Sequence, residues 1–128
     1  MVTTFTHRVC PETGLKVCSD AEKLIKANAV VAVVFLAIGG LFGLLVALTR
    51  WPALHILPAD LFYLALTGHG ADILIFWVMF FEVAILYFAS ALLLNCRLAT
   101  PRFAWLAFAL MLVGSLMANV AVLQGESS

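Results

Sequence analysis

The sequence predicts an all-α integral membrane protein with three transmembrane helices. Its 128 residues are 65% hydrophobic and 11% charged, whereas an ordinary soluble domain is about 45–50% apolar and about 25% charged. The mean hydropathy is +1.13. Three long apolar stretches are separated by short polar segments. At about 1.5 Å per helical residue, each stretch is long enough to cross a hydrocarbon layer of about 30 Å.

The N-terminal segment, residues 1–26, is the one stretch with ordinary soluble composition. Ser19 and Asp20 are suited to cap a short amphipathic helix over residues 21–27. Leu24 and Ile25 would then face the bilayer surface while the lysines face water. The charged residues of the segment are Arg8, Glu12, Lys16, Asp20, Glu22, Lys23 and Lys26. We therefore predict a cytoplasmic segment, residues 1–26, before a transmembrane domain, residues 27–128.

The first predicted span covers residues 27–48, which contain no charged residue. Gly39, Gly40 and Gly43 lie in its middle. Small residues allow another helix to approach closely in a membrane, and glycine is also simply tolerated there. Both interpretations stay open at this stage.

The second and third predicted spans follow a connection over residues 50–68. Pro52 and Pro58 interrupt any helix there, and the apolar connection is expected to lie on the membrane surface or under other protein. The second span covers residues 69–94. Thr100 and Pro101 are typical of a helix start, so the third span is placed at residues 102–124.

The distribution of positive charge predicts the orientation, because cytoplasmic loops are enriched in lysine and arginine. One side has six positive residues: Arg8, Lys16, Lys23, Lys26, Arg97 and Arg102. The other side has Arg50 alone. The N-terminus is therefore predicted in the cytoplasm, and the beginning of the second span, with His69, near the outer face.

His69 is the strongest candidate for a cofactor-binding residue. Gly68 and Gly70 flank it, and the absence of two side chains leaves room for a flat group such as haem, for which imidazole is a common axial ligand. Phe76 and Phe80 fall within about 60° of His69 around an α-helix and would line a porphyrin. The alternative is that His69 caps the helix or lies in the membrane interface.

Two carboxylates lie in the second span. Glu82 is about 140° from the His69 side of an α-helix, and an intramembrane carboxylate costs about 2.5 kcal/mol or more unless it is paired, hydrated or protonated. It is a candidate for a proton path, with a protonated packing residue as the alternative. Asp72 lies one turn after His69, where it is suited to orient that residue, to bind near a haem propionate or to begin the helix favourably.

The remaining residues give weaker indications of a functional site. His7 and His55 have no second ligand at metal-binding spacing. Cys10 and Cys18 are spaced more loosely than a zinc knuckle, and two thiols or a metal or redox pair both remain open. The zero net charge argues against nucleic-acid binding, and no hydrolase constellation is present in the sequence.

The segment LTGHGADILIFWVMFFEVAILYFASALLLN, residues 66–95, resembles the second helix of subunit I of the haem-copper terminal oxidases. Its Thr67-Gly68-His69-Gly70 matches the T-x-H-G motif of that family. Residues 21–48 look like the first helix of the family. The likeness covers residues 21–123 and is closer to divergent branches than to mitochondrial-type cytochrome oxidases.

The resemblance implies that His69 is an axial ligand of the low-spin haem, b- or a-type, in an oxygen-reducing proton pump of a prokaryotic plasma membrane. The copper-binding residues of the family come later in its chain, so copper is expected to be bound outside this sequence. Implied partners are the remaining helices of the subunit, other oxidase subunits, membrane lipid and an external donor: cytochrome c, a cupredoxin or a quinol.

The chain is therefore expected to be a fragment or a split piece of a catalytic subunit, and not catalytic alone. A nitric oxide reductase is a close alternative, because the same helix serves there. The alternative of another class is a small three-helix accessory or assembly subunit without its own cofactor.

Overall fold

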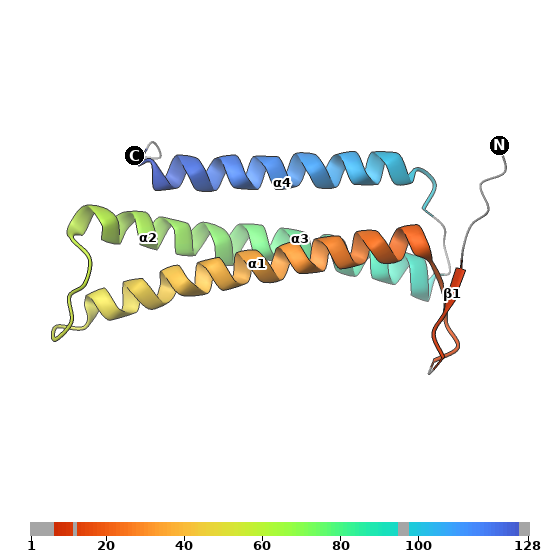
Figure 1. The fold of residues 1–128 in the computed structure, drawn as a ribbon, viewed down its shortest axis with the longest axis horizontal. Coiled ribbons are helices and arrows are strands. Elements are labelled where there is room, and N and C mark those ends of the chain that lie inside the picture. Colours follow the sequence, from red (N-terminus) through yellow and green to blue (C-terminus); the bar gives the residue numbers. More distant parts are fainter. Residues whose placement is uncertain (1–6, 12, 95–97, 126–128) are drawn as a thin grey trace.

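The computed structural model describes residues 7–11, 13–94 and 98–125. Three long helical rods lie side by side, with a small hairpin at one end and the loop between the first two rods at the other (Figure 1). Each rod is long and apolar enough to cross a membrane. The prediction of an all-α membrane fold with three spans is confirmed for the membrane-embedded part.

The first rod is helix α1, Ser19–Arg50. The predicted amphipathic helix over residues 21–27 is helical, but it is the beginning of α1 and not a separate element. No glycine or proline occurs between Ser19 and Gly39, so nothing interrupts the backbone hydrogen bonds where the chain leaves the soluble segment.

The second rod is helical from Ala59 to Leu93. It consists of α2 (Ala59–Ala71), the π-helical turn η1 (Asp72–Phe76), α3 (Trp77–Phe88) and a second π-helical turn, η2 (Ala89–Leu93). The predicted connection over residues 50–68 is therefore too long. Pro58 is the N-cap residue, a place that proline tolerates because the first helical turn needs no intrahelical N–H bond there.

Because α2 begins at Ala59, His69 does not lie at the beginning of the second rod. It lies ten residues after Ala59, about 15 Å along the axis. The sequence analysis placed His69 at the beginning of the predicted span, whereas the helix itself begins at Ala59.

The third rod is α4, Pro101–Leu123, with Thr100 as N-cap and proline at the first position, as predicted. It packs mainly on α2 and touches α1 more lightly. Most of its large apolar residues are exposed, which suits a helix surrounded by lipid or by further helices.

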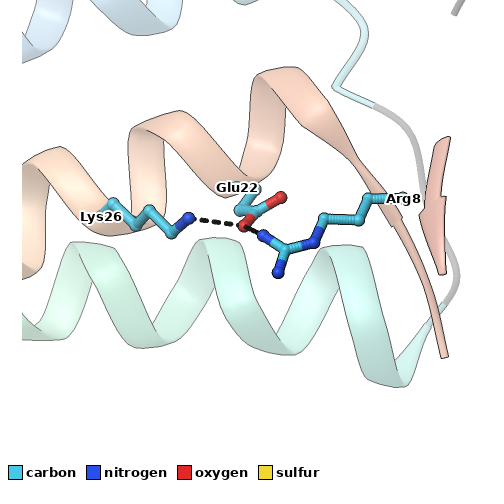
Figure 2. A network of polar contacts seen from close by, with 3 residues as sticks. All are labelled: Arg8, Glu22 and Lys26. Carbon is cyan, nitrogen blue, oxygen red and sulfur yellow. Dashed lines mark hydrogen bonds and ion pairs between the residues drawn. The ribbon is translucent and has the colours of Figure 1, made fainter. Parts of the chain in front are cut away.

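The N-terminal segment contains an antiparallel hairpin, β1 (His7–Val9) paired with β2 (Lys16–Cys18). It was not predicted, because strands this short show no usable alternation. Gly14 has a φ of +65° in its turn, a conformation that glycine adopts without strain. The hairpin is anchored to α1 by Arg8, which donates to Oε1 of Glu22 at 2.7 Å (Figure 2). Lys26, on α1 itself, donates to the same oxygen at 2.6 Å.

The core of the bundle is aromatic. Ala32 and Phe35 of α1 and Phe80 of α3 are buried together, with residues of α4 such as Phe108 and Met111 packed against them. The Phe35 and Phe80 rings stack at 5.8 Å between centroids, and Phe108 meets Phe80 edge-on at 6.0 Å. This cluster joins all three rods and fixes how α1 crosses the second one.

Candidate functional site

His69 lies on α2 and its ring reaches across to α1. Its Nδ1 is 2.7 Å from the carbonyl oxygen of Gly39. A carbonyl can only accept, so Nδ1 carries the proton and donates it. In a neutral imidazole the lone pair is then on Nε2, which leaves that nitrogen as the atom able to bind a metal.

Two glycines of α1 make room for this ring. A Cβ on Gly43 would lie 2.7 Å from Cε1 and 2.8 Å from Nδ1 of His69. A Cβ on Gly39 would lie 2.9 Å from Cβ of Asp72. The interpretation of the glycines as a packing face is confirmed for these two, whereas Gly40 faces open space. The imidazole occupies a groove that any side chain at position 43 would fill.

The glycines that flank His69 have different surroundings. Gly68 is buried, and a Cβ there would lie 3.1 Å from the ring of Phe42 on α1. Its missing side chain therefore serves helix packing. Among the residues that the structure describes, no atom lies within 4 Å of a Cβ position on Gly70. That either glycine lies beside a cofactor stays a prediction.

Phe76 and Phe80 contact α1, as His69 does. All three residues therefore lie on the same side of the second rod. Phe76 packs against Phe35 with centroids 5.3 Å apart, and Phe80 is fully buried. In this structure the two rings form part of the aromatic core. The prediction that they line a porphyrin is not tested by these contacts.

Asp72 is fully buried at the turn where α2 ends. Its Oδ1 accepts a hydrogen bond from Nδ2 of Asn119 on α4, at 2.9 Å, while Oδ2 has no hydrogen-bond partner within the described part of the chain. Asn119 was missed by the sequence analysis. It is a polar residue inside an apolar span, and that was the available signal, since such residues usually bond across helices.

Glu82 lies on α3, eleven residues before Leu93 or about 16 Å along the axis. Its side chain is exposed, so it points away from the three-helix core and not toward the His69 groove. An exposed carboxylate at this depth of a membrane requires a polar neighbour or a proton.

His55 lies in the loop between α1 and α2, with Nδ1 3.2 Å from the carbonyl oxygen of Thr49. His7 belongs to β1, at the opposite end of α1. Within the described ranges no group of three histidine, cysteine or acidic side chains is close enough together to hold a metal ion. His69 is thus a single donor, of the kind that one face of a haem iron takes.

The three apolar rods define an integral membrane protein whose polar residues meet between the helices. Residues 23–128 match the family model described as Cytochrome C and Quinol oxidase polypeptide I. The chain belongs to this family, subunit I of the cytochrome c and quinol oxidases. The resemblance seen in the sequence is thereby confirmed at the level of the family, whose members bind haem. No curated protein and no solved structure matches the chain significantly.

Proposed function

We propose that this chain supplies His69 as one axial ligand of the low-spin haem in an oxidase of this family. The observation that carries the proposal is the hydrogen bond from Nδ1 of His69 to the carbonyl oxygen of Gly39. Histidines that bind metals usually donate their second ring N–H to a carbonyl or carboxylate, which fixes the tautomer and the ring orientation.

The residues present fit a haem in two respects. The hydrogen bond to Gly39 leaves the lone pair of the imidazole on Nε2, which lies 3.4 Å from where a Cβ on Gly43 would be. Among the described residues, no atom lies within 4 Å of a Cβ position on Gly70. When bound, the haem supplies one-electron transfer. The second axial ligand and the copper site belong, in this proposal, to helices outside the chain, so the chain is one part of a catalytic subunit and does not reduce oxygen alone.

The proposed setting is a prokaryotic plasma membrane with the N-terminus in the cytoplasm. Six positive residues in residues 1–26 and 97–102 of the sequence, against one at Arg50, support this orientation. His69 then lies in the outer half of the bilayer, toward an external electron donor such as cytochrome c, a cupredoxin or a quinol. The other proposed partners are the remaining helices of the subunit, further oxidase subunits and lipid.

The test is the visible spectrum of the purified oxidase, with this chain coexpressed with the remaining helices. His69→Ala is expected to abolish the reduced low-spin haem band, because one axial ligand is lost. His55→Ala is the matched control and should leave the band intact. An unchanged band in His69→Ala would refute haem ligation and leave the role of a cofactor-free accessory or assembly subunit.

We further propose that Glu82 belongs to a proton path, supported by its exposed position inside a membrane span. Glu82→Gln keeps the shape but removes the titrating group, so it should slow proton-coupled turnover and leave the haem spectrum unchanged. Turnover equal to that of the wild type across the pH range would reduce Glu82 to a structural role.

A further inference from the structure

The contact between Asp72 and Asn119 joins α4 to the second rod at the level of His69. The two side chains are 47 residues apart in sequence, and Nδ2 of Asn119 also approaches the carbonyl oxygen of Ser115, at 3.2 Å. Asp72 is fully buried. A polar contact of this kind in an apolar interior has a defined geometry, because a displaced partner would leave buried polar atoms without hydrogen bonds.

Asp72 also touches the residue that orients His69. Its Cβ would be 2.9 Å from a Cβ on Gly39, the glycine whose carbonyl accepts the imidazole N–H. The backbone of α1 is thus enclosed at Gly39 by two side chains of the second rod, three residues apart. Any shift of Asp72 toward α4 or away from it changes how closely Gly39 approaches His69.

The backbone at Asp72 departs from an α-helix. Its N–H is shared between the carbonyl oxygens of Gly68 and His69, and its own carbonyl accepts from the N–H of Trp77 in an i→i+5 bond. Single π-helical turns inside α-helices are rare and frequently occur at functional sites. In this chain the π-helical turn begins at Asp72, which bonds to Asn119 and packs against Gly39.

We propose that Asp72 and Asn119 are positioning residues for the His69 imidazole, holding the Gly39 carbonyl and the ring in one orientation. The inference rests on the proposed function of His69. The orientation of an axial imidazole and the strength of its N–H bond influence the electronic state and the reduction potential of a bound haem. The two residues act through packing and do not touch the iron.

The experiment compares variants of the purified, haem-loaded oxidase by electron paramagnetic resonance of the low-spin haem and by redox titration. Asn119→Leu keeps the volume but removes the donor, and it should shift the low-spin g values and the midpoint potential while haem content stays within twofold of wild type. Asp72→Ala should shift them in the same direction. Asp72→Asn retains an amide oxygen that can accept from Asn119, so it should keep wild-type values.

Ser115→Ala is the matched control, because its hydroxyl bonds to the Met111 carbonyl on the same helix and should not affect the spectrum. If Asp72→Ala assembles no haem, Asn119→Leu decides the question. Wild-type g values and potential in Asn119→Leu would overturn the positioning role. That failure is separate from failure of the proposed function, which would appear as a low-spin band that persists in His69→Ala.

Discussion

The interface between α1 and the second rod has two levels, which are stabilised by different interactions. At the upper level, Gly39 and Gly43 bring the α1 backbone against His69 and Asp72, and a hydrogen bond fixes the contact. At the lower level, Phe35 packs on Phe76 and Phe80 without polar atoms. At the upper level, the missing glycine side chains and the hydrogen bond fix one orientation of the His69 ring. At the lower level, aromatic packing stabilises the contact between the helices and tolerates small adjustments of the rings.

The largest loss of stability is expected at the lower level. Phe80→Ala should lower the free energy of unfolding in mixed micelles by about 3 kcal/mol, the low end for such a change in soluble cores, because a lipid-like solvent reduces the transfer component. Phe81→Ala is the control, since Phe81 is exposed. The low-spin haem spectrum should persist in both variants; equal stability of the two would show that the aromatic level contributes little cohesion.

An intermediate loss of stability, but a larger spectral change, is expected at the upper level. Gly43→Ala places a methyl group 2.7 Å from the His69 ring, and overpacking of this kind costs about 1–3 kcal/mol. The displaced ring should lose its bond to Gly39 and with it most of the low-spin haem band. Gly40→Ala meets no atom within 4 Å and should behave as wild type. A normal band in Gly43→Ala would remove the distinction between the levels.

The smallest effect is expected outside the membrane, at the ion pairs of Figure 2. Arg8→Gln removes the hairpin contact to Glu22, but the Arg8 side chain is 65% exposed, and exposed pairs contribute little. The Tm should fall by less than in either variant above, and the difference should shrink as salt is added. A loss as large as that of Phe80→Ala would mean that the hairpin, and not the core, holds α1 in place.

The apolar runs predicted three spans because lipid imposes a minimum length on any helix that crosses it. The helix start at Ala59 was missed because Pro52 and Pro58 were taken to interrupt any helix over the whole of residues 50–68. His69, Gly39 and Gly43 could be selected from residue type alone. The contact between Asp72 and Asn119 could not, because it joins helices that are distant in sequence and depends on how α4 docks.

The π-helical turn Asp72–Phe76 has a consequence for chain length. Its i→i+5 bond accommodates one residue more than an α-helical turn would hold. Deleting a single residue there would let the turn close as a regular α-helix, and the residues after it would keep their orientation about the axis. The same deletion in a regular α-helical turn would rotate the residues after it by about 100° and turn Phe80 away from Phe35. The wide turn is therefore a place between His69 and Phe80 where the helix can lose one residue and still keep both side chains against α1.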